Sequence, residues 1–83
     1  MDKIMIEVYV PVLGKAYDFR IPLESGMYEV LELIKKSVTD LSDGHFLCDE
    51  QTVLCYRSDA KILDINLSVY ELGLQTGSKL MLI

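Results

Sequence analysis

The sequence predicts an α+β roll, in which a mixed four- to five-stranded sheet packs on one α-helix. Three observations support this prediction. Two alternating segments flank a glycine turn, one segment with helical periodicity follows, and short apolar segments fill the second half. The chain has 83 residues, so a single domain over residues 1–83 is expected. A core this small leaves little room for a deep substrate pocket.

The N-terminal part alternates between apolar and other side chains with a period of two, which is typical of β-strands. Residues 4–12 place one apolar set on a common face: Ile4, Ile6, Val8, Val10 and Val12. Residues 16–23 place a second set on a common face: Tyr17, Phe19, Ile21 and Leu23. Gly14 lies in the short connection, so the two segments are predicted to form a β-hairpin.

From Met27 to Leu41 the apolar period becomes that of an α-helix. The apolar stripe consists of Met27, Val30, Leu31, Ile34, Val38 and Leu41. Ser25 is expected to cap the helix, because its hydroxyl can accept a hydrogen bond from an unpaired amide of the first turn. The polar stretch 40–44 ends in glycine and is expected to stop the helix.

The second half of the chain predicts short strands and turns. Residues 53–57 and 79–83 are predicted to be strands, and residues 61–63 a brief edge strand. Residues 67–74 are expected to form a 3₁₀ turn or a single helical turn. The last strand is expected to lie beside the first and parallel to it, which would place it at the centre of the sheet.

Side-chain directions follow from these assignments. Leu80 and Leu82 are expected to face the helix, and Met81 and Ile83 to face away. Phe46 and Leu47 are expected to tuck the connection 45–52 onto the core.

The charge and the hydropathy of the sequence exclude some classes of partner. The chain carries 13 acidic and 8 basic side chains, which gives a net charge of −5. It repels a phosphate backbone on average, so nucleic acid is not an expected partner. There is no apolar run long enough to cross a bilayer, so direct membrane insertion is not expected. The sequence opens Met1-Asp2-Lys3 without a signal-peptide core, so a cytoplasmic location is expected.

Two cysteines and one histidine are the candidates for thiol or metal chemistry. Cys48 and Cys55 are too few for a disulfide framework, so two part-buried free thiols are expected. Together with His45 they offer three metal ligands, but their spacing fits no common zinc pattern and no metal site is expected. His45 is expected to be a solvated loop residue. The sequence contains no catalytic motif, so neither enzyme activity nor a cofactor is expected.

Two segments near the C-terminus carry a resemblance to a known family. Asn66-Leu67-Ser68-Val69-Tyr70-Glu71-Leu72 contains a Leu-Ser-x-Tyr turn, and Gly77-Ser78-Lys79-Leu80-Met81-Leu82 is a predicted last strand with alternating leucines. Both segments are similar to the end of ubiquitin. The strand 53–56 is similar to the third strand of ubiquitin. The resemblance spans nearly the whole chain and implies the ubiquitin-like β-grasp roll. It also implies that the Tyr70 ring packs against its loop and that its hydroxyl bonds to the backbone.

One departure from ubiquitin concerns the tail. Ubiquitin and the sulfur-carrier proteins of this fold end in a Gly-Gly tail that enters an enzyme's active site. This sequence ends Leu80-Met81-Leu82-Ile83 within its last strand, so conjugation and sulfur transfer are not expected. Two alternatives stay open: a carrier-type protein with a truncated tail, and a ubiquitin-like interaction domain cut from a larger protein.

Two further segments carry a second resemblance: Tyr17-Asp18-Phe19-Arg20-Ile21-Pro22 and Gly73-Leu74-Gln75-Thr76-Gly77-Ser78-Lys79-Leu80. They are similar to segments of the small bacterial ubiquitin-like proteins of type VII secretion loci, the YukD/EsaB family. This resemblance implies a non-conjugating cytosolic accessory or regulatory component of a secretion machine. The partners that it implies are proteins, such as membrane or ATPase components of that machine.

The sheet face that points away from the helix is the candidate protein-binding surface. Its predicted members are Met5, Tyr9, Cys55, Met81 and Ile83. A solvated sheet face normally carries polar residues, so a contiguous apolar group there favours a partner surface. The alternative is a scattered apolar surface, which is common. The acidic residues Glu24, Glu29 and Glu32 on the helix flank are expected to be solvated, and docking of a basic partner is the alternative.

Overall fold

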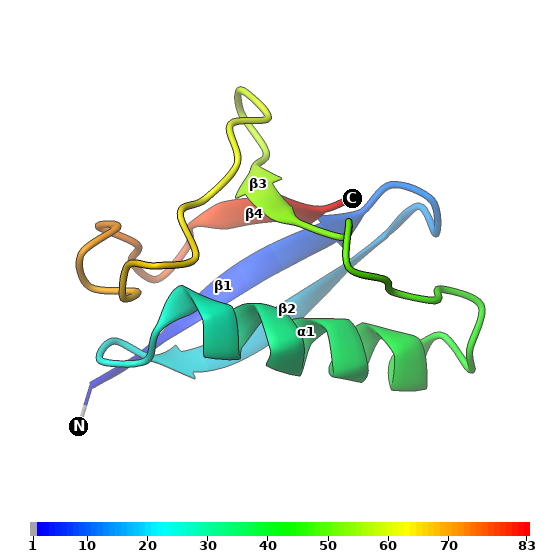
Figure 1. Cartoon of the computed structure of the whole chain (residues 1–83), viewed down its shortest axis with the longest axis horizontal. Coiled ribbons are helices and arrows are strands. Elements are labelled where there is room, and N and C mark those ends of the chain that lie inside the picture. The colour runs from blue at the N-terminus through cyan, green and yellow to red at the C-terminus, as the bar shows by residue number, and fades with distance from the viewer. Residues whose placement is uncertain (1) are drawn as a thin grey trace.

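The computed structural model describes residues 2–83 and begins with a β-hairpin (Figure 1). Strands β1 (Lys3–Val10) and β2 (Lys15–Pro22) pair antiparallel. The chain reverses directly after Val10, whose carbonyl oxygen accepts hydrogen bonds from the amides of Leu13 (3.0 Å) and Gly14 (2.9 Å). The prediction that Val12 continues the buried face is therefore wrong: Val12 lies in the turn and is 73% exposed.

Strands β3 (Leu54–Tyr56) and β4 (Lys79–Leu82) complete a four-stranded sheet of order β2-β1-β4-β3. β4 is parallel to β1 and antiparallel to β3, and Figure 1 shows it in red between its two neighbours. The predicted central position of the last strand is thus confirmed. Residues 61–63 form no strand of their own. Ile62 makes an isolated bridge to Cys55, flanked by two backbone hydrogen bonds to β3. The amide of Tyr56 donates to the oxygen of Lys61 (2.9 Å), and the amide of Leu63 donates to the oxygen of Leu54 (3.0 Å).

Helix α1 (Met27–Leu41) covers one face of the sheet. Its predicted stripe is buried except for Leu41, which is 59% exposed because it is the last residue of the helix. The predicted Ser25 cap is wrong: Gly26 occupies the N-cap position, without a side-chain bond. Loop carbonyls satisfy the first amides instead. Met27 donates to the oxygen of Leu67 (2.9 Å), and Tyr28 donates to the oxygen of Ile65 (3.2 Å).

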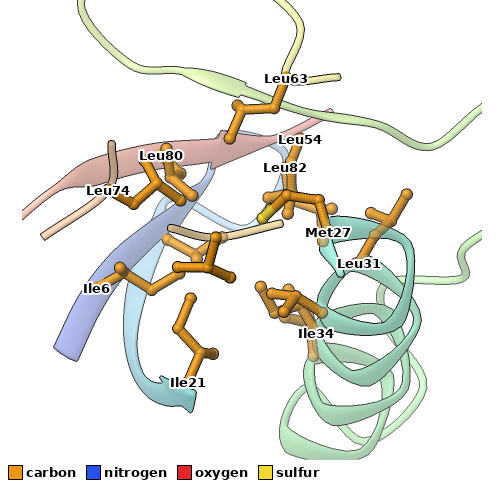
Figure 2. Close-up of a cluster of buried hydrophobic side chains, with 14 of the residues drawn as sticks. Ile6, Ile21, Met27, Leu31, Ile34, Leu54, Leu63, Leu74, Leu80 and Leu82 are labelled. Carbon is orange, nitrogen blue, oxygen red and sulfur yellow. The ribbon is translucent and has the colours of Figure 1, made fainter. Parts of the chain in front are cut away.

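The core lies between α1 and the sheet, as Figure 2 shows. Met27 and Ile34 point from the helix toward the sheet residues Leu80 and Leu82. Both of these leucines are fully buried, as predicted. This one-sided burial, which follows from the period-two alternation of the strands, leaves the opposite face of the sheet uncovered by the helix.

The loops on either side of β3 depart most from the predictions. Phe46 packs against the core as expected, but Leu47 is 79% exposed, which corrects its predicted burial. The segment 67–74 contains the expected single helical turn, because the amide of Leu72 donates to the oxygen of Ser68 (3.1 Å). Tyr70 is 73% exposed and does not anchor this loop, so the expectation taken from ubiquitin is wrong. The neighbouring Val69 does so, since it is fully buried.

A reciprocal pair of hydrogen bonds also fixes this loop. The amide of Ser68 donates to Glu71 Oε1 (2.9 Å), and the amide of Glu71 donates to Ser68 Oγ (3.0 Å). This is the arrangement of a capping box, which here closes a turn. The loop is thereby held where its backbone meets the N-terminus of α1.

Candidate protein-binding face

The strand register sets the residues of the outer sheet face into rows, because directly opposed residues share one face of a sheet. One apolar row crosses the whole sheet: Ala16, Tyr9, Met81, Cys55 and Ile62. The adjacent row is charged, with Asp18 opposite Glu7 and Glu7 opposite Lys79. Arg57 follows β3 and extends this row, since its amide donates to the oxygen of Lys79 (3.2 Å).

The predicted site residues differ in exposure. Met5 is 38% exposed and Ile83 is 50% exposed, while Tyr9 and Met81 are half-buried. Tyr9 and Met81 are directly opposed in the parallel pairing of β1 and β4. Ile83 continues the face beyond β4, where it exchanges two backbone hydrogen bonds with Val53 (2.9 and 3.0 Å). These four residues share the outer face and are accessible.

Cys55 is a correction to the predicted site. Its side chain is fully buried although it belongs to the outer face, because Met81 and Ile62 flank it in the same row. Its Sγ lies 3.6 Å from the carbonyl oxygen of Met81 and can donate to it. Burial raises the pKa of the Cys55 thiol, and the Asp59 carboxylate raises it further. Cys55 therefore packs beneath the accessible residues of the outer face, and its side chain is not available for contact with a partner.

Ile62 takes the place that was assigned to Cys55. Its side chain is 60% exposed at the β3 side of the apolar row. The edge strand predicted at residues 61–63 could have indicated this contact. A segment that pairs with β3 places one of its residues beside Cys55 on the outer face. We define the outer face by its accessible apolar residues: Met5, Tyr9, Ile62, Met81 and Ile83.

Arg57 is the functional candidate that sequence reasoning missed. Its Nη1 lies 3.5 Å from Glu7 Oε2, and its guanidinium carbon lies 4.3 Å from the centre of the Tyr9 ring. A cation above an aromatic face is attracted by the ring quadrupole. The side chain thus covers part of Tyr9 and joins the charged row to the outer face. No sequence pattern signalled this contact, since 48 residues separate the two positions.

A shallow hollow lies beside the charged row. Its volume is about 370 Å³, and its lining consists of Tyr56, Arg57, Ser58, Ser78 and Lys79. The mixture of an aromatic ring, hydroxyl groups and two cations can receive a polar or acidic side chain at the border of the outer face.

The remaining candidates for metal or thiol chemistry lie elsewhere. Cys48 is half-buried, with Sγ 3.5 Å from the oxygen of Lys35 on the helix. His45 is exposed, and its Nδ1 lies 2.6 Å from the oxygen of Ser42. Within residues 2–83, no three metal-ligating side chains are close enough to hold an ion.

None of the helices in the described part of the chain has both the length and the apolar character needed to cross a membrane.

Comparison with known proteins gives structural matches and no sequence match. No family model matches the chain. No curated protein matches its sequence either. The solved structures that it resembles include the ubiquitin-like domain of the Mycobacterium tuberculosis type VII secretion system protein EccD1. That match has a TM-score of 0.79 at 14% identity, and it covers 100% of this chain and 99% of that one.

Two further structures show the same architecture. Ubiquitin from Caldiarchaeum subterraneum matches with a TM-score of 0.70 at 18% identity over 99% of this chain and 92% of that one. The ubiquitin-like domain of yeast Ddi1 matches with a TM-score of 0.73 at 17% identity over 96% and 86%. At these identities the likeness concerns the fold. With its sheet order and single helix, the chain has the ubiquitin-like β-grasp fold.

Proposed function

We propose that the chain is a non-catalytic, non-conjugating ubiquitin-like protein that binds a partner protein through its outer face, as a cytoplasmic accessory or regulatory component of a type VII secretion system. The observation that carries the binding role is the apolar row across the sheet. Tyr9, Met81 and Ile62 stay accessible there, on the face that α1 leaves uncovered.

The composition of this face suits protein recognition. Its apolar centre contains methionine and tyrosine, which adapt their shape and combine apolar area with a polar end. The charged row borders it with both signs, since Glu7 and Asp18 lie beside Lys79 and Arg57. An apolar centre with a polar rim is the usual anatomy of a protein–protein interface.

The link to type VII secretion rests on two independent supports. The fold matches the EccD1 domain over the full length of both chains. The segments 17–22 and 73–80 also resemble the YukD/EsaB family, and this resemblance implies a cytosolic protein. In this proposal the partner is a protein of the secretion machine, such as its membrane or ATPase component.

Affinity capture from the native cytosol and membrane fractions tests this proposal. The immobilised chain is expected to retain a protein of a type VII system, and Met81→Asp is expected to weaken that binding by at least about tenfold. The reason is that a charge in the centre of an apolar contact must be desolvated without a partner. Binding is measured by titration with the purified partner.

Leu41→Asp is the matched control. It also replaces a solvent-accessible apolar residue by aspartate, but Leu41 is 59% exposed, whereas Met81 is half-buried, and it lies at the end of α1 on the opposite side of the sheet. Both variants are expected to stay folded by circular dichroism. Wild-type affinity of Met81→Asp for the partner, or an equal loss of affinity in both variants, would show that the outer face is not the binding surface. Capture of proteins from other systems alone would refute the link to secretion.

A further inference from the structure

Strand β2 forms an edge of the sheet, and the hydrogen bonds of β1 show which of its backbone groups are open. The amide of Glu7 donates to the oxygen of Ser78 (3.0 Å), and the oxygen of Met5 accepts from the amide of Gly77 (2.9 Å). These β1 residues thus turn their backbone groups toward β4. In antiparallel pairing, the residues opposite them turn theirs the other way.

The residues opposite Met5 and Glu7 are Arg20 and Asp18. Their amides and carbonyl groups therefore point to the open side of β2, as do those of Ala16. Pro22 belongs to the same set by its alternation with Arg20, so its missing N–H falls on the open side and costs no bond to β1. An unpaired row of this kind is a template for another strand.

The side chains at this edge are also incompletely covered. Tyr17 and Phe19 face the core side but are only half-buried. Leu33, on the neighbouring flank of α1, is 49% exposed. A hollow of about 290 Å³ lies between the strand end and the helix, lined by Ile21, Pro22, Ser25, Glu29, Val30 and Leu33. Apolar area is thus left open next to the unpaired backbone.

The charges of β2 determine which register a second β2 can adopt. A two-fold axis must lie at a residue, because an axis between residues would oppose an outer-face side chain to an inner-face one. An axis at Asp18 or at Arg20 opposes two like charges. An axis at Phe19 instead sets Asp18 opposite Arg20 of the second copy, and it does so twice by symmetry.

The same register suits the inner face and pairs the open backbone groups of Asp18 and Arg20, while Ala16 falls opposite Pro22 of the second copy, which has no N–H to donate. It sets Phe19 opposite its own copy and Tyr17 opposite Ile21, so apolar residues meet on the side of the helices. Asp18 and Arg20 are the residues with open amides and carbonyls, so the oppositely charged pairs are also the hydrogen-bonded pairs. Within the single chain, Asp18 faces the like-charged Glu7, and a second copy brings a cation beside it.

We propose that the chain forms a two-fold symmetric dimer through β2, paired antiparallel about Phe19, in which the two sheets join into one. The ligand of this edge is a second copy of the chain. The edge is distinct from the outer face, so the dimer leaves Met81 and Tyr9 accessible.

Charge exchange across the axis tests the register. Sedimentation equilibrium over a concentration series is expected to show a reversible monomer–dimer equilibrium for the wild-type chain. Asp18→Arg and Arg20→Asp are each expected to raise the dimer dissociation constant by at least about tenfold, since two like-charge contacts replace two complementary ones. Equimolar mixing of the two variants is expected to give a heterodimer, and the double exchange in one chain is expected to restore dimerisation.

Further measurements distinguish loss of dimerisation from loss of folding and from loss of partner binding. Both residues are exposed, so each single variant is expected to keep the wild-type circular dichroism spectrum. In the wild-type chain, the amides of Ala16, Asp18 and Arg20 are expected to gain hydrogen-exchange protection as concentration rises. Met81→Asp is expected to dimerise normally, so that failure of the outer-face proposal leaves this one standing.

A chain that stays monomeric at its highest soluble concentration overturns the dimer. A dimer that is insensitive to both single exchanges, with no preference for the mixed pair, overturns the β2 register.

Discussion

The guanidinium carbon of Arg57 lies 4.3 Å from the centre of the Tyr9 ring, and the same side chain approaches Glu7 at 3.5 Å. Arg57 follows β3, whereas Tyr9 and Glu7 belong to β1, so these contacts reach across the intervening β4. Both members of the ion pair are more than a third exposed, so solvent screens their attraction.

We expect a double-mutant cycle between Arg57→Ala and Tyr9→Ala to give a coupling of about 0.5–1 kcal/mol in the free energy of unfolding, measured by urea titration. Arg57→Lys is expected to retain only part of this coupling, because an ammonium group cannot stack on the ring as a planar guanidinium does. Additive single effects would show that the stacking contributes no stability.

Alternation in β4 makes a second prediction. Leu80→Ala is expected to lower the free energy of unfolding by about 2–5 kcal/mol, because Leu80 is fully buried and its removal leaves a cavity. Met81→Ala is expected to cost less than about 1 kcal/mol, since that side chain is only half-buried on the outer face. Chemical denaturation of the two variants measures this difference. Similar losses in the free energy of unfolding would contradict the assigned side-chain directions, in which Leu80 faces the core and Met81 faces outward.

The loop that meets the helix N-terminus makes a third prediction. Ser68→Ala removes the acceptor of the Glu71 amide and is expected to cost about 0.5–2 kcal/mol. Glu71→Gln keeps an acceptor for the Ser68 amide and is expected to cost less. In Ser68→Ala, hydrogen exchange at the amides of Met27 and Tyr28 is expected to accelerate, because the loop supplies their acceptors. Unchanged hydrogen exchange at these two amides would show that the Ser68–Glu71 turn does not stabilise the N-terminus of α1.

The buried thiol makes a fourth prediction. Burial and the Asp59 carboxylate raise the pKa of Cys55 above its ordinary value of 9.0, so the folded chain holds this proton more tightly than the unfolded chain does. The resulting stability is complete below the unfolded pKa and is lost as pH rises through the folded one. Above about pH 9, the wild-type free energy of unfolding is therefore expected to fall more steeply with pH than that of Cys55→Ala.

Cys48→Ala is the control for this effect, because Cys48 is half-buried and lies outside the sheet. In the native protein, Cys48 is also expected to react with a thiol reagent well before Cys55. Equal pH slopes in wild type and Cys55→Ala, or equal reactivity of the two thiols, would contradict the burial of Cys55.

Periodicity predicted the fold because each element buries a single face. The alternation around Leu80 and Leu82 and the helical stripe from Met27 to Val38 depend only on local geometry, and both are present in the structure. At the ends of the strands and the helix, the apolar periodicity of the sequence extends beyond the region that the core covers. Val12 and Leu41 fit the period, yet they lie beyond the covered area.

The candidate site was less predictable, because exposure on an outer face depends on neighbours distant in sequence. Alternation correctly placed Cys55 away from the helix, but only the bridge to Ile62 determines that it is buried. Ser25 has the chemistry of a cap, and the carbonyls of Leu67 and Ile65 take that role from a loop far along the chain. Such competition between partners leaves no local pattern.

The parallel pairing of Glu7 with Lys79 has a consequence for how the protein is made. During synthesis, the hairpin and α1 emerge long before the strand that belongs between β1 and β3. Until residues 79–82 leave the ribosome, β1 exposes its unpaired amides and the helix has only half a sheet to cover. Closing so long a loop is slow, and a half-finished sheet invites aggregation. The nascent chain is therefore most vulnerable just before β4 is available.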